Sequence, residues 1–279
     1  MSSGCNYPLV SVIVPTYNSS STLEACIHSI KIQTYPNKEV IVADNFSGDS
    51  TAQISKNMGA TVLLNCGRPR NPGSCRNQGL RKSAGQYILF LDSDETLSRL
   101  VIEECVELCR KDDFGMVKIP LVFVGKGVWG ASSAYWRNCH YRISKHTIGN
   151  FPRFFKRECI PDTAYDEDLR WGEDLELYTR MRSKRVSEAY CTSIMLHQEP
   201  TGLKEMISKN IFYAGATATY ERVVGSQVYP LLLSQAFLAF GEMLQNPPRS
   251  MTLLAGLFFF LSAKSIAMAV GSLRNRWLS

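Results

Sequence analysis

The sequence lacks the features that define several classes of protein. Its nine cysteines include no Cys-x-x-Cys pair, which argues against a zinc site or a disulfide framework and for reduced thiols in the cytosol. Residues 1–8 hold no basic stretch followed by an apolar core, so we expect no secretory signal. A formal net charge of +6 is too small to indicate a nucleic-acid partner by itself, and we expect none.

What the chain does contain is typical of a globular α/β protein. Its 279 residues are 45% hydrophobic and 20% charged, which excludes a disordered tail, a collagen-like rod and a membrane protein built mostly of spans. The composition changes after Pro200. We therefore expect one domain over 1–200 and an appendage over 201–279.

The first half of the chain alternates short apolar strands with helices, and the middle is mixed. The alternation, with strands apolar on both faces, indicates a mainly parallel sheet with helices on both sides. We expect strands at 9–14, 38–43, 60–64, 86–91, 115–124, 151–155 and 188–196, and helices at 23–30, 50–57, 75–83, 97–110, 134–146 and 172–182.

The C-terminal part contains two apolar stretches after an expected helix at 201–224. The stretch at 228–244 is short for a membrane span, which needs about 20 residues. The stretch at 251–273 is long enough, but it holds Lys264 near its middle. Arg274 closes it with a positive charge, as cytoplasmic flanks do. We favour attachment to the membrane, as a shallow hairpin or as one span, over two core helices of a soluble domain.

Two carboxylates follow the most apolar strand directly, in the Asp-Ser-Asp motif at 92–94. Residues two apart in an extended segment point to the same side, so Asp92 and Asp94 can face one cation. Mg²⁺ and Mn²⁺ prefer such oxygen ligands and commonly share them with a diphosphate. The alternative is that Asp94 simply caps the next helix.

Two further polar residues lie where a nucleotide could bind. Asp44 ends its strand and could accept hydrogen bonds from a base or a ribose, although its neighbours are also turn formers. Arg76 lies in the first turn of a helix, beside backbone N–H groups suited to phosphate or base recognition. A surface arginine is the alternative.

Asp174 and His197 are the remaining candidates. Asp174 lies in the acidic first turn of a helix, where the helix dipole alone would favour it. The same position in a cleft suits a general base that takes a proton from an acceptor hydroxyl. His197 follows an apolar strand and could be a third metal ligand or a structural histidine.

The order and spacing of these motifs resemble the inverting family-2 glycosyltransferases of the GT-A fold. The resemblance covers about residues 9–200. It is carried by Val-Ile-Val-Pro-Thr-Tyr-Asn at 12–18, Cys-Arg-Asn-Gln-Gly at 75–79, the strand ending in Asp-Ser-Asp at 85–94, and Tyr-Asp-Glu-Asp-Leu at 165–169 leading into Gly-Glu-Asp at 172–174.

The resemblance implies a role for each matching residue. The base and ribose of a nucleotide sugar would be held in the half 9–95, and the acceptor in the half 96–200. Asp94, with His197, would bind the Mn²⁺ or Mg²⁺ ion that bridges the diphosphate, and Asp174 would be the general base. The nucleotide-binding residues implied are Pro15, Tyr17, Asn18, Asp44, Arg76 and Asp92.

The resemblance also implies the reaction. One sugar would pass with inversion from a nucleotide sugar, with UDP-sugars favoured, to a hydroxyl of a lipid-linked or cell-surface glycan. The enzyme would lie at the cell membrane, with its catalytic domain on the cytoplasmic side. The Gln-x-x-Arg-Trp motif of processive synthases is missing, and the usual Asp-Asp-Gly-Ser opening is Asp-Asn-Phe-Ser at 44–47.

Three alternatives stand beside this interpretation. Within the family, a polyprenyl-phosphate hexose synthase would use an acceptor phosphate that needs no base. A sugar-phosphate nucleotidyltransferase typically begins with a glycine-rich phosphate loop, and residues 9–24 contain no glycine. An inactive membrane-bound scaffold would not need to retain Asp92, Asp94 and Asp174.

Overall fold

The computed structural model describes residues 7–66, 71–144, 151–169, 172–211, 238, 241–248 and 250–276. The chain divides into two compact units. The first unit comprises Met1–Pro120, Phe151–Asp168 and Glu173–Leu196. The second comprises Leu121–Asn150, Leu169–Gly172 and His197–Ser279. The second unit therefore combines the expected appendage with a segment from the middle of the chain.

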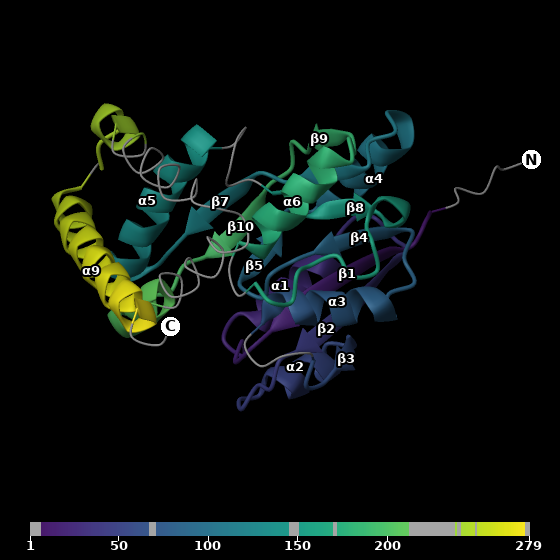
Figure 1. Cartoon of the computed structure of the whole chain (residues 1–279), viewed down its shortest axis with the longest axis horizontal. Helices are drawn as coiled ribbons and strands as arrows, with labels where there is room; N and C mark the ends of the chain where they lie inside the picture. Colours follow the sequence, from purple (N-terminus) through teal and green to yellow (C-terminus); the bar gives the residue numbers. More distant parts are fainter. Residues whose placement is uncertain are drawn as a thin grey trace, which may run out of the picture. The chain divides into compact units, whose positions relative to one another are not determined.

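The first unit is built on a seven-stranded sheet of the mixed, mainly parallel type that the sequence predicts. Strand β1 (Val10–Thr16) is parallel to β2 (Lys38–Asp44) and β4 (Tyr87–Phe90) on its two sides, whereas β8 (Phe154–Lys156) is antiparallel to β4 and β6 (Met116–Lys118). In spatial order the strands are β3 (Thr61–Leu63), β2, β1, β4, β8, β6 and β9 (Glu188–Tyr190) (Figure 1).

Helices connect and cover these strands, as strands buried on both faces require. Every residue of β1 is buried, so side chains on both faces of that strand are covered. Residues of α3 (Pro72–Lys82) and α6 (Glu173–Ser183) share one core cluster with residues of β1, β4 and β8, among them Ile13, Phe90 and Phe155. The helices of this unit are α1 (Leu23–Lys31), α2 (Thr51–Asn57), α3, α4 (Val101–Lys111) and α6, with a 3₁₀ turn at Arg157–Cys159.

Several expected elements differ in extent from those observed; the helix expected at 134–146, for example, begins seven residues earlier, at Gly127. The strand expected at 115–124 is two strands, β6 and β7 (Leu121–Val124), separated at Pro120, which has no N–H group for a continuous ladder. The helix expected from residue 97 begins at Val101, because Glu95–Leu97 forms strand β5. The strand expected at 188–196 is divided into β9 and β10 (Met195–Gln198).

The second unit is mainly helical in its described part. Its helices are α5 (Gly127–Ser144), a helix at 203–211, and α9 (Met251–Arg276), which contains the apolar stretch at 251–273. A Cβ atom at Gly256 of α9 would lie 2.4 Å from Cγ1 of Val128, so the two helices touch at this glycine. The core consists of Trp136, Cys139, Met206, Met243, Leu257 and Phe260.

Two expectations for the C-terminal part fall largely outside the described residues. Of the apolar stretch at 228–244, only 238 and 241–244 are described, and the expected helix at 201–224 is described to 211. Within the described part of the chain, no helix combines the length and apolar character that a membrane crossing requires.

Candidate active site

The strand order of the first unit defines where a ligand can bind. The order β3-β2-β1-β4 reverses direction between β1 and β4, and open α/β sheets bind ligands outside the carboxyl ends of the strands at such a point. Thr16 pairs with Asp44, and the N–H of Leu91 bonds to the carbonyl of Ile13, so the three strands end together. The loops after β1 and β4 meet: Oγ of Ser19 lies 2.8 Å from Oγ of Ser93.

Asp44 shapes the loop at this edge. Its side chain is buried and accepts hydrogen bonds from the hydroxyl of Thr16 at 3.0 Å and from the N–H of Ser47 at 3.1 Å. Of the other residues predicted here, Pro15 is buried within β1, whereas Tyr17 is 41% exposed. The predicted residues after β1 and β2 therefore lie at one sheet edge, with Tyr17 presented to solvent.

Arg76 is positioned by the start of α3. Pro72 occupies the first turn, and the side chain of Asn71 accepts a hydrogen bond from the N–H of Ser74, so the helix begins three residues before its predicted start. Asn77 then ties the helix to the segment before α6: its Oδ1 accepts the N–H of Tyr165 at 2.9 Å. Arg76 faces the site between these anchors.

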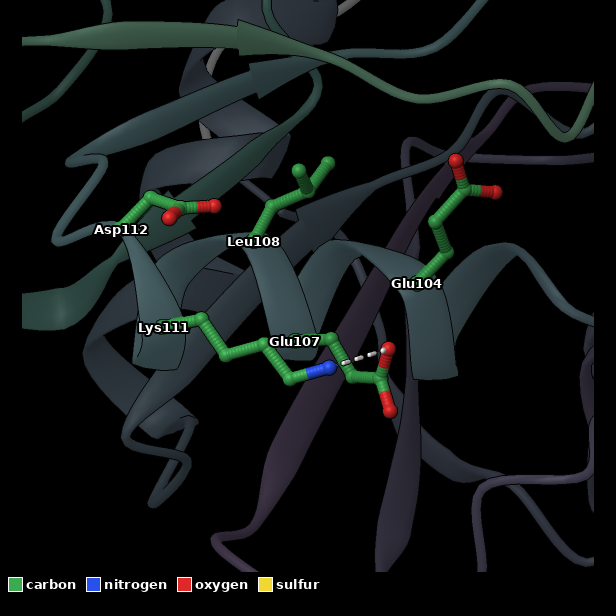
Figure 2. Close-up of a pocket in the computed structure, with 5 residues that line it drawn as sticks. All are labelled: Glu104, Glu107, Leu108, Lys111 and Asp112. Atoms are coloured by element: carbon green, nitrogen blue, oxygen red, sulfur yellow. Dashed lines mark hydrogen bonds and ion pairs between the residues drawn. The ribbon is translucent and has the colours of Figure 1, made fainter.

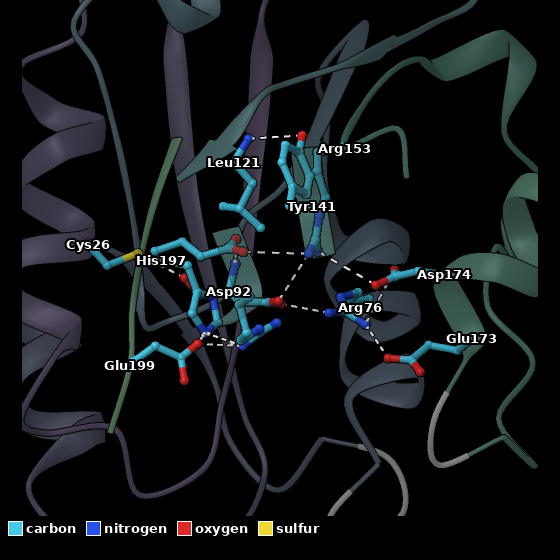
Figure 3. A network of polar contacts seen from close by, with 12 residues as sticks. Cys26, Arg76, Asp92, Leu121, Tyr141, Arg153, Glu173, Asp174, His197 and Glu199 are labelled. Atoms are coloured by element: carbon cyan, nitrogen blue, oxygen red, sulfur yellow. Dashed lines mark hydrogen bonds and ion pairs between the residues drawn. The ribbon is translucent and has the colours of Figure 1, made fainter. Parts of the chain in front are cut away.

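The guanidinium of Arg76 joins the two predicted catalytic regions. It is 3% exposed, and it donates to Oδ1 of Asp92 at 2.6 Å and to Oε1 of Glu173 at 2.8 Å (Figure 3). Burial opposes its charge, but Asp92, Asp174 and other neighbours outweigh burial and raise the pKa of Arg76 well above its ordinary value. Sequence analysis assigns Arg76 to nucleotide binding, whereas in the structure its guanidinium is bound to carboxylates of the protein itself.

Arg153 is a site residue that sequence analysis missed. It precedes β8, and its backbone carbonyl accepts the N–H of Phe90, which brings it beside the end of β4. Nη2 lies 3.3 Å from Oδ2 of Asp92 and 3.5 Å from Oε1 of Glu95. Burial opposes the charge, yet the surrounding carboxylates raise the pKa of Arg153 above its ordinary value. No local motif marks this arginine; only the antiparallel pairing of β8 with β4 brings it here.

Asp174 lies in the first turn of α6, near both arginines but outside hydrogen-bond distance of either. Its carboxylate oxygens are 3.9 Å from Nη1 of Arg76 and 3.8 Å from Nη1 of Arg153, and its side chain is 20% exposed. A carboxylate that is partly open to solvent can be reached by an acceptor hydroxyl. The arrangement suits a general base.

The donor set at the end of β4 fits one divalent ion held together with a ligand. Both oxygens of Asp92 face arginines, so Asp94, which is partly exposed, supplies the remaining carboxylate of the motif. No group of three or more His, Cys, Asp or Glu side chains is arranged to hold a metal among the residues that the structure describes. Mg²⁺ is usually held by one or two carboxylates plus phosphate oxygens and water, and Asp94 suits that role.

His197 belongs to the second unit and lies in a cluster of its own there. Its Nε2 is 3.3 Å from Nη1 of Arg137 and 3.6 Å from Oε1 of Glu199 (Figure 3). Burial opposes ionisation of Glu199, but Arg137 and other cations outweigh it and lower its pKa to about 2. The role of His197 as a metal ligand remains a prediction.

A surface pocket lies away from these residues in the sequence and in the fold. Its lining residues come from α4 and from Asp112, which directly follows that helix (Figure 2), and Lys111 pairs with Glu107 at 3.4 Å. The lining residues are Glu104, Glu107, Leu108, Lys111 and Asp112. None of them is at the carboxyl edge of the sheet, so this pocket is not the candidate active site.

The sheet and the carboxylates at its edge define an α/β protein with a candidate ligand site at the carboxyl ends of its strands. Comparison with known proteins gives the family. The family described as Glycosyl transferase family 2 matches residues 11–164, more than half of the chain. The chain belongs to this family.

One curated relative is the GalNAc(5)-diNAcBac-PP-undecaprenol beta-1,3-glucosyltransferase of Campylobacter jejuni. It is 36% identical over 192 residues, which are 64% of this chain and 61% of the relative. The chain thus spans about three fifths of the length of that relative.

Two solved structures show the same GT-A fold. A mannosyltransferase from Pyrobaculum calidifontis, in complex with GDP-Man and Mn²⁺, has a TM-score of 0.63 at 19% identity and covers 96% of this chain and 88% of its own. Glucosyl-3-phosphoglycerate synthase from Mycobacterium tuberculosis, in complex with Mn²⁺ and UDP-glucose, has a TM-score of 0.55 at 20% identity. The match covers 77% of this chain and 78% of the synthase chain.

Proposed function

We propose that this chain is an inverting glycosyltransferase that moves one sugar at a time from a nucleotide sugar, with UDP-sugars favoured, to a hydroxyl of a lipid-linked or cell-surface glycan. The observation that carries the proposal is the pair of arginines that joins Asp92, at the end of the donor-side strand, to Asp174, at the start of α6. The name of the Campylobacter relative supports a lipid-linked acceptor, and the ligands of the two solved structures support a nucleotide-sugar donor.

In the proposed reaction, Asp174 takes the proton of the acceptor hydroxyl while the oxygen attacks the anomeric carbon in line. The new oxygen–carbon bond forms as the bond from that carbon to the diphosphate breaks, which inverts the configuration. Arg76 and Arg153 hold the carboxylates of Asp92 and Asp174 in their relative positions. A Mn²⁺ or Mg²⁺ ion held by Asp94 would stabilise the negative charge of the departing diphosphate as a Lewis acid. Pro15, Tyr17, Asn18 and Asp44 would border the base and ribose.

Donor binding is the first test of this proposal. The purified full chain is titrated with a panel of UDP- and GDP-sugars in the presence of Mn²⁺ or Mg²⁺, beside Asp94→Asn. We expect metal-dependent binding and slow donor hydrolysis with one nucleotide, and loss of both on addition of a chelator or in the variant. If the folded wild-type protein binds no nucleotide sugar with either metal, the proposed reaction is wrong and the inactive-scaffold alternative gains.

We also propose that the second unit attaches the enzyme to a membrane surface, with the catalytic domain on the cytoplasmic side. Helix α9 buries Leu257 and Phe260 in the core of its unit, but other apolar side chains of the same helix face outward. Phe258 is 69% exposed and Phe259 is 60% exposed. Exposed aromatic residues on a helix favour the interfacial region of a bilayer.

Flotation with lipid vesicles tests this attachment. We expect the wild-type chain to float with vesicles that contain anionic lipid, and the double variant Phe258→Ser with Phe259→Ser to remain in the soluble fraction. Ile194→Ser is a matched control, because Ile194 is also exposed, at 38%, but belongs to the first unit. Equal flotation of the wild-type chain and the double variant would contradict a role for α9.

A further inference from the structure

Phe46 has an unfavourable backbone conformation at the edge of the sheet where the nucleotide is proposed to bind. It lies two residues after Asp44, the last residue of β2, with φ of +60° and with 45% of its surface exposed. The left-handed region is a genuine outlier for a bulky residue and costs about 1–2 kcal/mol, whereas glycine adopts it readily. A phenylalanine here therefore needs an explanation that local backbone preference does not provide.

Hydrogen bonds on both sides of Phe46 hold the backbone in this conformation. The N–H of Ser47 donates to the buried carboxylate of Asp44 at 3.1 Å, and Oγ of Ser47 accepts the N–H of Asn18 at 2.8 Å. Oδ1 of Asn18 accepts the N–H of Gly48 at 2.8 Å. The loops after β1 and β2 thus brace each other, and Asn18 is itself left-handed, with φ of +49°. The neighbouring residues therefore determine the backbone conformation of Phe46. Because the residue is 45% exposed, burial of its ring offsets little of the conformational cost.

The position of the Phe46 ring suggests a role in ligand binding. Thr16 pairs with Asp44 at the ends of β1 and β2, so Tyr17 and Phe46 follow one and two residues beyond a single register pair. Both are exposed aromatic residues on neighbouring strand ends, at 41% and 45%. Strained residues that their surroundings hold in place concentrate at ligand sites, where the strain keeps a group in its binding position before the ligand arrives.

We propose that Phe46 is a fixed stacking surface for the base of the donor nucleotide. This inference rests on the proposed nucleotide-sugar donor and adds a residue that determines its affinity. A base offers an aromatic face whatever its identity, and stacking of one base on an aromatic side chain contributes about 1–3 kcal/mol. The ring contacts the base only, so the diphosphate and the metal are bound without it.

Three substitutions separate the ring from the strained backbone. Phe46→Ala removes the ring and keeps a side chain at positive φ, Phe46→Gly removes both ring and strain, and Phe46→Trp keeps an aromatic face. The probes are UDP and inorganic pyrophosphate, each titrated by calorimetry in the presence of Mn²⁺. Leu100→Ala serves as a control, because Leu100 is an exposed apolar residue, at 53%, that lies outside this edge.

We expect Phe46→Ala and Phe46→Gly to weaken UDP binding about five- to thirtyfold, and Phe46→Trp to stay within about threefold of the wild type. Pyrophosphate binding should be equal in all four proteins. Phe46→Gly should unfold at the same temperature as the wild type or higher, since the strain is relieved; a merely structural phenylalanine would make both truncations less stable.

The outcomes also separate this inference from the proposed function. If the wild type binds UDP and Phe46→Ala binds it equally well, the stacking role is overturned and the proposed donor stands. Equal loss of UDP and pyrophosphate binding in Phe46→Ala would also overturn the role, because the substitution would then have disturbed the whole loop. If the wild type binds neither probe, the proposed donor itself fails.

Discussion

Nη1 of Arg153 lies 3.8 Å from Oδ2 of Asp174, while Nη2 of the same guanidinium lies 3.3 Å from Oδ2 of Asp92. One side chain, only 12% exposed, thus faces both the proposed general base and Asp92, which lies just beyond the end of β4. Because an arginine fork is planar and rigid, it fixes the relative position of two carboxylates in a way that lysine cannot. Arg76 makes the same connection from α3.

Arg153→Met should therefore damage both stability and activity. The substitution keeps most of the apolar stem but leaves Asp92, Glu95 and Asp174 with less compensating charge in a largely buried site. We expect a loss of about 2–4 kcal/mol in the free energy of unfolding, measured with urea. Arg153→Lys should recover most of the stability but only part of the rate.

Lys111→Met is the control for this experiment. Lys111 is 70% exposed and pairs only at the surface with Glu107, so its removal should change stability by less than about 1 kcal/mol. A fully active and equally stable Arg153→Met protein would show that the fork does not position the two carboxylates.

The Asp174→Asn variant tests whether Asp174 acts as the general base. The amide cannot take a proton but has nearly the same shape, so donor binding should change by less than about threefold. We expect the turnover rate to fall about 10²–10⁴-fold with a hydroxyl acceptor, because general-base catalysis contributes on that order. Asp162→Asn is the control. The side chain of Asp162 is 83% exposed, so its substitution should leave the turnover rate unchanged. Activity near the wild-type level in Asp174→Asn would instead favour a polyprenyl-phosphate acceptor, which is already ionised.

The fold was predictable from the sequence to the extent that its elements are local. The apolar strands that become β1, β2 and β4 end in polar residues, and their ends do meet at one edge of the sheet. The predicted ends of helices and strands were wrong where a tertiary contact determines the end of the element. In the turn between β9 and β10, the N–H groups of Thr192 and Ser193 donate to the carboxylate of Glu104 in α4, a contact that no local pattern indicates.

The candidate site was predictable where each residue ends a strand or begins a helix. Asp92 and Asp174 were predicted in this way, and in the structure both lie near the guanidinium of Arg76. Arg153 was missed because its place depends on the antiparallel insertion of β8 beside β4. The left-handed backbone of Phe46 was missed for a different reason: phenylalanine is among the residues least expected there, and hydrogen bonds from a neighbouring loop impose it.

Glu104 should make stability depend on pH in the acid range. Burial opposes its ionisation, but the N–H groups of Thr192 and Ser193 outweigh burial and lower its pKa from 4.5 to about 2. Because the folded pKa is the lower one, the contribution is present above the unfolded pKa and is lost as the pH falls from about 5 toward 2. We expect Glu104→Gln to be about 1–2 kcal/mol less stable at pH 7, after allowance for solvent screening, with the difference shrinking at acid pH.

Urea unfolding at pH 7, 5, 4 and 3 measures this difference. Glu107→Gln is the matched control on the same helix, because its side chain is 57% exposed and its ion pair with Lys111 lies at the surface. A constant gap between Glu104→Gln and the wild type across the whole range would contradict the lowered pKa.

Gly79→Ala tests why the motif at 75–79 ends in glycine. Alanine in the middle of an exposed helix is normally about 0.5–1 kcal/mol more stable than glycine. Here a Cβ atom would lie 2.4 Å from Cγ2 of Ile13, a fully buried residue of β1, so α3 would have to move away from the sheet that carries the site. We expect the clash to outweigh helix propensity and cost about 1–3 kcal/mol, measured by thermal unfolding. Gly48→Ala, where a Cβ would meet nothing within 4 Å, should change the unfolding temperature little. A more stable Gly79→Ala protein would mean that α3 is free to shift on β1, and that the rigid placement of Arg76 does not depend on this close contact.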